Sequence, residues 1–428
     1  MPSLDNSLSA SHVMTSRWQP LYENALIGGL SFLPVICVVA PRFAGPGPVL
    51  LALVLCVLHV MAFARGPSIP RNILFWALVF PALMGLSGLW GINPDQTLER
   101  TTRALPVFLA GAVLWSMGTA LPALARVRFH RVFLYAVMIA GAFCAFELHT
   151  GARLYYWLNE SISPDEKFNL SRLNRSVAVF IICAIPAFYC AQQLSASRRS
   201  RTLLMMALGV ITILVLVGTK SQSVQLASVL AVIFYVAFPY RQRWAWFGLG
   251  AILAAGLLGT PWIAHYLFTH LADMTARISW LSSSYMPNRM EIWDFVTRRA
   301  LEQPWLGHGV EATRDIKDFQ TAKMYHNASE VLHPHNFAAQ LWIEFGVLGA
   351  LLGASFFAFI LRGIARTALP GARTMLALLI ACISIAATGY GLWQSWWLGL
   401  FVMALASLAV AMPPRASSDT PSEKPLSN

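Results

Sequence analysis

Charged side chains are scarce in this chain of 428 residues, of which 12% are Asp, Glu, Lys or Arg and 57% are hydrophobic. Soluble domains carry about 25% charged residues, so the composition excludes an ordinary soluble protein. The hydrophobic residues form runs of about 17–25, long enough for a helix to cross about 30 Å of hydrocarbon. Because backbone amides in lipid must be satisfied internally, we expect an all-α, polytopic integral membrane protein with about twelve transmembrane helices.

Several familiar signals are also missing. No CxxC pair occurs, and all cysteines fall inside predicted spans, so neither disulfides nor a cysteine metal site is expected. No GxxxxGK[ST] loop and no GxGxxG after a strand is present, which argues against a bound nucleotide. The first twenty residues lack a basic region followed by an apolar core, so residues 1–20 are interpreted as a cytoplasmic tail and not as a signal peptide. Residues 413–428 are expected to form a second cytoplasmic tail.

The predicted spans divide into nine helices over residues 21–260 and three over residues 336–412. They begin near Leu21, Pro48, Ile73, Ala104, Val132, Ser176, Thr202, Ser221, Trp244, Asn336, Thr374 and Leu392. Residues 261–335 between them are expected to form one large loop that contains short helices. We expect residues 289–300 to be an amphipathic helix, because Ile292, Trp293, Val296 and Ala300 recur at helical spacing.

Charge in the short loops predicts the orientation. Alternate loops contain arginine and no acid, at Arg65 and Arg71, at Arg126, Arg128 and Arg131, at Arg198, Arg199 and Arg201, at Arg241 and Arg243, and at Arg362, Arg366 and Arg373. Because Lys and Arg are enriched in cytoplasmic loops, both termini are expected in the cytoplasm and the large loop in the periplasm of a bacterial inner membrane. The net charge of +12 follows these loops, so we expect contact with membrane lipids and no nucleic acid.

The large loop carries motifs that point to a family. They are Asn288-Arg289 with Trp293 four residues after the arginine, Pro304-Trp305-Leu306-Gly307-x-Gly309, and His333-x-His335-Asn336 leading into Gln340, Glu344 and Gly346. From about Val217 to Gly349 this pattern resembles the Wzy_C-type superfamily of O-antigen ligases, O-antigen polymerases and protein oligosaccharyltransferases. The resemblance implies a glycosyltransferase that needs no cofactor or metal and takes its glycan from undecaprenyl diphosphate. For a ligase, the acceptor is lipid A–core.

A diphosphate leaving group requires fixed positive charge. We expect Arg289 and Lys220 to supply it, with Arg175 nearby. Lys220 lies in a turn that opens a span, where free amides favour an anion, although the family usually has arginine there. The alternatives are an exposed salt bridge for Arg289 with Asp294 or Glu291, and a snorkelling side chain for Lys220.

His335 is the expected catalytic base, because imidazole titrates near neutral pH and the start of a helix favours its neutral form. A cap role is the alternative. His333 is a weaker candidate for the substrate site. A zinc site of His326, His333 and His335 has spacings that fit no known pattern.

Further residues are expected to bind substrate. Asn336, Gln340 and Glu344 recur every four residues and should share one helix face, where Glu344 orients an arginine, lines the substrate site or serves as another base. Basic residues before two spans would surround the phosphates of donor or acceptor, or simply anchor the helices at the interface: Arg100, Arg103, Arg172 and Arg175.

Three functions compete. A ligase is favoured over a polymerase because only one periplasmic loop is large. A transporter is disfavoured because no inverted repeat is evident and few charges lie within spans. The protein is expected to act as a monomer.

Overall fold

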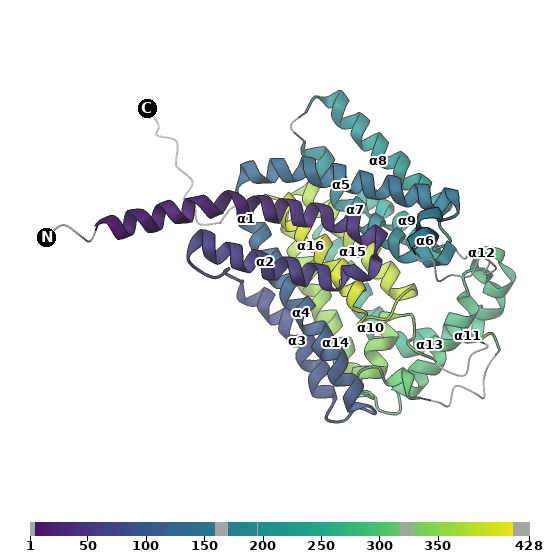
Figure 1. The fold of residues 1–428 in the computed structure, drawn as a ribbon. Helices are drawn as coiled ribbons and strands as arrows, with labels where there is room; N and C mark the ends of the chain where they lie inside the picture. The colour runs from purple at the N-terminus through teal and green to yellow at the C-terminus, as the bar shows by residue number, and fades with distance from the viewer. Residues whose placement is uncertain (1–4, 159–169, 195, 317–323, 327–330, 414–428) are drawn as a thin grey trace, which may run out of the picture.

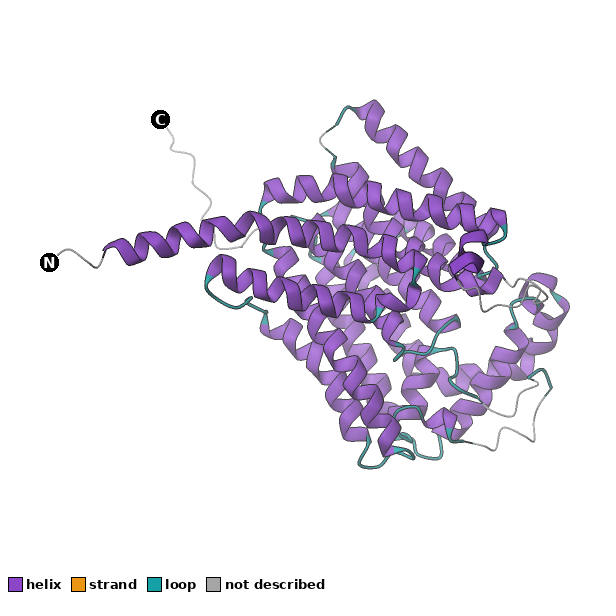
Figure 2. Cartoon of the chain, viewed as in Figure 1, coloured by secondary structure: helices purple, strands orange, loops and turns teal. Residues whose placement is uncertain are grey.

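The computed structural model describes residues 5–158, 170–194, 196–316, 324–326 and 331–413. The described residues form helices and connecting loops, with no strand among them (Figure 2). The α-helices are α1 (Asp5–Val39), α2 (Pro46–Phe63), α3 (Arg71–Ser87), α4 (Pro94–Thr119), α5 (Ala123–Thr150), α6 (Arg153–Leu158), α7 (Asn174–Gln193), α8 (Arg198–Gly218), α9 (Gln222–Ala237), α10 (Arg243–Leu258), α11 (Thr260–Arg277), α12 (Ser279–Ser282), α13 (Met286–Ala300), α14 (Phe337–Ala365), α15 (Leu369–Thr388) and α16 (Ser395–Ala411). The 3-10 helices are η1 (Pro41–Ala44), η2 (Leu170–Leu173) and η3 (Ala312–Arg314).

The all-α, multi-pass class is confirmed. Among the described residues, 7 helices are long and apolar enough to cross a membrane: α1 from Arg17, α2, α5, α7 with η2, α8, α14 and α15. An eighth span is counted if α10 and α11, which meet at an angle of 75°, cross together. Helices α3, α9 and α16 are apolar but shorter, and α4 begins with charged residues. Each predicted span falls on a helix, but fewer than twelve meet the length and composition expected of a span.

The first helix begins earlier than expected. Helix α1 starts at Asp5 and continues to Val39, so the boundary expected near residue 20 lies inside a continuous helix. The second tail falls on residues 414–428, which lie outside the described part of the chain.

The helices pack around a large apolar core. Helix α16 packs against α4 and α7, α15 against α9, and α1 against α5. Trp397, Phe129 and Phe345 are among the largest fully buried side chains. Figure 1 shows the start of α1 at one end of this bundle and helices α11–α13 at the other. The described part of residues 261–335, the large loop of the sequence analysis and called the polar segment from here on, therefore lies at one end of the bundle.

The polar segment is largely helical. Helix α13 spans Met286–Ala300 and packs on α11 and α14. Its predicted apolar positions, Ile292, Trp293, Val296 and Ala300, are all buried, so the amphipathic helix is confirmed. It begins three residues earlier than expected, directly before Pro287, which is favoured in the first turn of a helix.

Helix α14 is interrupted at Gly346, where φ is +60° and ψ is −149°. Residues 304–309, which follow α13, cross α14 at this break and form hydrogen bonds with its backbone on both sides of Gly346. The bonds run from Val347 N to Pro304 O (2.7 Å), from His308 N to Ile343 O (2.7 Å) and from Gly309 N to Glu344 O (3.0 Å). Backbone groups in lipid need such partners, so the crossing segment makes the break possible.

Two glycines allow this close approach. A Cβ on Gly307, whose φ is +64°, would lie 2.5 Å from the carbonyl carbon of Glu344. A Cβ on Gly309, whose φ is +86°, would lie 2.5 Å from the Cα of Gly91, just beyond α3. The Pro-Trp-Leu-Gly-x-Gly motif thus has a structural role, because it fastens the polar segment to both α14 and the end of α3.

Candidate active site

His335 lies in the turn that leads into α14, with a positive φ of +53°. Its Nδ1 donates to the carbonyl oxygen of Gly389 at 2.5 Å. Because a carbonyl only accepts, the proton of the neutral ring sits on Nδ1, and Nε2 carries the free lone pair. Burial lowers the pKa of His335 and the nearby charge of Arg289 lowers it further, against the opposing effect of the Gly389 hydrogen bond. His335 is therefore held as a neutral base with Nε2 as its accepting atom.

The backbone around His335 is fixed on both sides. The indole of Trp293 in α13 donates to Pro334 O at 2.9 Å. Asn336 is the N-cap of α14, and its side-chain oxygen accepts from the amides of Ala338 (2.9 Å) and Ala339 (3.2 Å). Such a cap is worth about 1 kcal/mol. The side-chain oxygen of Asn336 thus orients the loop, and substrate binding by this residue stays a prediction.

Arg289 is half-buried in the first turns of α13 and has no acidic partner among the described residues. The salt bridge considered as its alternative role is absent, because both neighbouring acids are engaged elsewhere. Asp294 pairs with Arg298 (3.0 Å) and with His265 (2.8 Å). Glu291 accepts from the backbone amides of residues 324, 325 and 326, at 2.6, 2.8 and 2.9 Å. The guanidinium of Arg289 is thus available to an external anion.

Tyr390 connects Arg289 to a second unpaired cation. The carbon at the centre of the Arg175 guanidinium lies 5.4 Å from the centroid of the Trp396 ring, and the Tyr390 ring meets Trp396 edge-on at 4.6 Å. Burial raises the pKa of Tyr390 to about 12, although the charges of Arg175 and Arg289 act to lower it. The phenol therefore stays protonated and can donate a hydrogen bond. Like Arg289, Arg175 has no carboxylate partner in the described part of the chain.

Lys220 lies in the turn between α8 and α9, as expected, and is exposed. Its ammonium has no hydrogen-bond or ion-pair partner in the described ranges. The Ser223 hydroxyl donates to Thr388 O at 3.2 Å, so the start of α9 adjoins the residue before Gly389. Lys220 is thus on the same end of the bundle as His335, without a direct contact between them.

Gln340 and Glu344 share one face of α14, as predicted, and the amide of Gln340 donates to Glu344 at 2.9 Å. Glu344 is 1% exposed and also accepts from Glu311 N (3.0 Å) and from the indole of Trp393. The side-chain oxygen of Gln340 accepts from Leu392 N at 2.8 Å. The expected contact between Glu344 and an arginine is absent from the described residues. Instead, Glu344 fixes the backbone of Glu311, which itself binds arginines.

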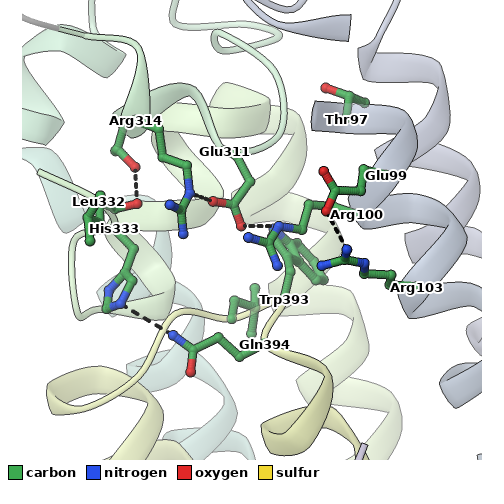
Figure 3. Close-up of polar contacts among 12 residues, drawn as sticks. Thr97, Glu99, Arg100, Arg103, Glu311, Arg314, Leu332, His333, Trp393 and Gln394 are labelled. Atoms are coloured by element: carbon green, nitrogen blue, oxygen red, sulfur yellow. Dashed lines mark hydrogen bonds and ion pairs between the residues drawn. The ribbon is translucent and has the colours of Figure 1, made fainter. Parts of the chain in front are cut away.

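Two further predicted residues, His333 and Arg100, lie in a polar cluster (Figure 3). The ring centroid of His333 is 4.1 Å from that of His335, and its Nε2 is 3.3 Å from Gln394. Arg100 pairs with Glu311 at 3.1 Å, whereas Arg103 pairs with the exposed Glu99 at 2.7 Å. Burial, followed by the charges of His335 and Arg314, lowers the pKa of His333 to about 3.

Some predicted residues are not brought into this group. Arg172 is exposed in η2, and Arg103 faces outward beside Glu99. Conversely, three residues near the site were not predicted from the sequence: Tyr390, Glu311 and Arg314. The latter two lie three residues apart in the polar segment, a spacing that favours an ion pair, whereas nothing in the sequence distinguishes Tyr390. Within the described ranges, no three His, Cys, Asp or Glu side chains converge as metal ligands.

The fold and site define a polytopic membrane protein with a cationic, histidine-bearing site at one end of its helix bundle. Residues 207–354 match the model of the O-antigen ligase family, and the family resemblance is therefore confirmed over this part of the chain. The chain is 29% identical over 133 residues to a candidate polysaccharide ligase of Rickettsia conorii, and 28% identical over 130 residues to its counterparts in Rickettsia typhi and Rickettsia prowazekii. Each alignment covers 29% of this chain and 32% of the relative, so the chain matches about a third of the length of these proteins. No solved structure matches the chain significantly.

Proposed function

We propose that this protein is a glycosyltransferase that moves O-antigen polysaccharide from undecaprenyl diphosphate onto lipid A–core at the periplasmic face of the inner membrane. The family match over residues 207–354 supports a ligase of polysaccharide. The donor and acceptor belong to the proposal, as does the periplasmic orientation.

One observation carries the proposal most directly. Two guanidiniums, those of Arg175 and Arg289, lie near the same phenol without a carboxylate partner in the described residues, and a neutral imidazole lies beside them. Unpaired charge is costly to keep half-buried, so such groups are expected to bind an anion. A diphosphate is an anion of suitable size and charge, and the tyrosine adds a neutral donor to it.

The mechanism follows from these groups. A sugar hydroxyl of the acceptor attacks the anomeric carbon of the donor, and its proton moves to Nε2 of His335. The bond between the anomeric carbon and the diphosphate oxygen breaks, and undecaprenyl diphosphate leaves with the electron pair. Arg289 and Arg175 bind the oxygens on which negative charge develops, with Lys220 as a further cation at the same end of the bundle. His335 is regenerated when its proton passes to solvent.

Deletion of the gene in its native host tests the assignment. A ligase defect removes the long lipopolysaccharide ladder while lipid-linked polymer accumulates. A polymerase of the same superfamily would instead leave short glycans attached to lipid A–core. Normal lipopolysaccharide with a defect in a glycosylated protein would identify a protein oligosaccharyltransferase, and normal glycosylation throughout would remove all three assignments.

A further inference from the structure

A second pair of arginines acts on His333, whereas Arg289 acts on His335. Arg100 comes from α4 and Arg314 from the end of η3, and both contact the carboxylate of Glu311 (Figure 3). Glu311 is held in place at its backbone, because its amide donates to the buried Glu344 at 3.0 Å. The two arginines are thus fixed by the same framework that crosses the break in α14.

Both arginines contact the Glu311 carboxylate through Nε: Arg100 Nε lies 3.1 Å from one oxygen, and Arg314 Nε contacts the other. The terminal nitrogens of both guanidiniums make no hydrogen bond to a residue in the described part of the chain. The two side chains are 23% and 30% exposed, so solvent reaches both of them. In Figure 3 the guanidinium of Arg314 points toward His333 and Gln394, and that of Arg100 lies next to Trp393.

The cluster adjoins His333, whose ring centroid lies 4.1 Å from that of His335. Two guanidiniums share the single carboxylate of Glu311, whereas the oxygens of Glu344 accept from three other donors. The side-chain hydroxyl of Thr313 donates to Leu332 O at 3.1 Å, which ties the Glu311–Arg314 turn to the residue before His333. The charges of both arginines also lower the pKa of His333, as expected of cations close to that ring. His333 Nδ1 is buried without a partner in the described part of the chain.

We infer that the terminal nitrogens of Arg100 and Arg314 form a second anion subsite, which binds a phosphate group of the acceptor. The inference rests on the proposed function, because it assigns the acceptor to one side of the His333–His335 pair and the donor diphosphate to the Arg289 side. Paired forks of this kind suit a phosphate bound through two parallel hydrogen bonds. Glu311 is a positioning residue, since it orients both guanidiniums through their Nε atoms while the terminal nitrogens bind the ligand.

The test compares Arg314→Gln and Arg100→Gln with Arg128→Gln, which removes an ion-paired arginine on α5, next to Glu23 of α1. Binding of lipid A–core to each purified protein is measured, with its phosphates present and after their enzymatic removal. We expect Arg314→Gln and Arg100→Gln to weaken binding of the phosphorylated form by roughly 10-fold or more, which corresponds to one lost charge-assisted hydrogen bond. Binding of the dephosphorylated form and the affinity of Arg128→Gln should stay unchanged. Arg314→Lys, which keeps the charge, should recover part of the loss.

The outcomes separate the possible ligands. If the variants instead raise only the KM for the undecaprenyl diphosphate donor, the subsite holds the donor and the inference is wrong. If neither substrate is affected while the variants remain folded, the cluster is a structural ion pair and the inference is also wrong. If wild-type protein binds phosphorylated lipid A–core through these arginines but transfers no glycan to it, the inference stands and the proposed function fails.

Discussion

At the scale of single residues, the account depends on Arg289 lacking an acid. The two acids on α13 that could pair with it are held by other partners. A guanidinium left in this state has its donors available, and its planar fork can bind two phosphate oxygens at once. The chemistry thus depends on geometry that a lysine cannot reproduce.

Replacement of Arg289 should therefore slow transfer strongly. We expect Arg289→Ala to reduce the rate by roughly 10²–10³-fold, the usual cost of losing a donor to developing charge, and Arg289→Lys to recover only part of it. Arg298→Lys, on the same helix but paired with Asp294, should stay near the wild-type rate. Lys220→Arg should be tolerated, because it keeps the positive charge and adds donors directed at the same anion. The measurement is the initial rate at equal protein levels, and more than about half of the wild-type rate in Arg289→Ala would remove the diphosphate role.

The pH dependence of kcat/KM reports His335 in the free enzyme. Only the neutral imidazole accepts a proton, so the rate falls as the pH drops through its pKa. Burial and Arg289 lower this pKa below its ordinary 6.5, so the acid limb should lie below pH 6.5. Arg289→Gln removes one cause of the depression and should move the limb to higher pH. A limb above pH 6.5 in the wild type, or no movement in the variant, would assign the profile to another group.

At the scale of elements, helix α13 both carries Arg289 and holds part of the polar segment in place. Arg289 faces the site, while Glu291 holds the backbone of residues 324–326 with three hydrogen bonds. Glu291 is 2% exposed, and its loss would remove the acceptor of three part-buried hydrogen bonds, each worth about 0.5–1.5 kcal/mol. The helix therefore couples the cation to the fold of the polar segment.

Glu291→Ala should consequently disturb the site without touching substrate. We expect it to release residues 324–326, to increase protease cleavage there and to lower the transfer rate. Glu302→Ala removes an exposed carboxylate that pairs with Arg299 and should change neither. Limited proteolysis with mass spectrometry gives the answer. Equal cleavage in both variants would show that these three bonds contribute little.

The close approach of Gly307 to the backbone of α14 can be tested by adding a side chain at this position. A side chain on Gly307 would clash with the backbone of α14 and occupy an unfavourable positive φ. We expect Gly307→Ala to lower the Tm of the purified protein by several degrees, since such strain costs roughly 1–3 kcal/mol. Gly248→Ala, where an added Cβ meets nothing within 4 Å, should leave the Tm unchanged or raise it. A Tm for Gly307→Ala equal to that of Gly248→Ala would mean that the crossing segment can move away at little cost.

At the scale of the whole molecule, the end that holds His335 should face the periplasm. The acid-free arginine loops predict that orientation. Ser282→Cys in α12 should therefore react with a membrane-impermeant maleimide in intact cells, whereas Arg199→Cys should react only after the inner membrane is permeabilised. Both positions are exposed. The reverse pattern would place the site in the cytoplasm and contradict the proposed use of a lipid-linked donor.

Hydrophobic run length was sufficient to predict the helical class and to place each expected span on a helix, because the bilayer imposes length and polarity directly. The helix around Arg289 was predictable from its apolar spacing. The crossing at Gly346 was not, because it depends on hydrogen bonds between segments about forty residues apart. Tyr390 was missed for the same reason: its proximity to Arg289 and Arg175 arises only when α7, α13 and the α15–α16 loop meet. One expected role of Glu344 was to orient an arginine. Glu344 instead accepts from the backbone amide of Glu311, and Glu311 pairs with Arg100 and Arg314.

The central claim is transfer from a polyprenyl diphosphate with His335 as base and no metal or nucleotide. The most direct measurement uses purified protein in liposomes, with undecaprenyl diphosphate-linked O-antigen and lipid A–core, in EDTA and without ATP. The account predicts that the wild type forms long lipopolysaccharide and that folded His335→Ala forms none. Transfer by His335→Ala near the wild-type rate, or wild-type transfer that is lost in EDTA and restored by a divalent ion, would contradict it.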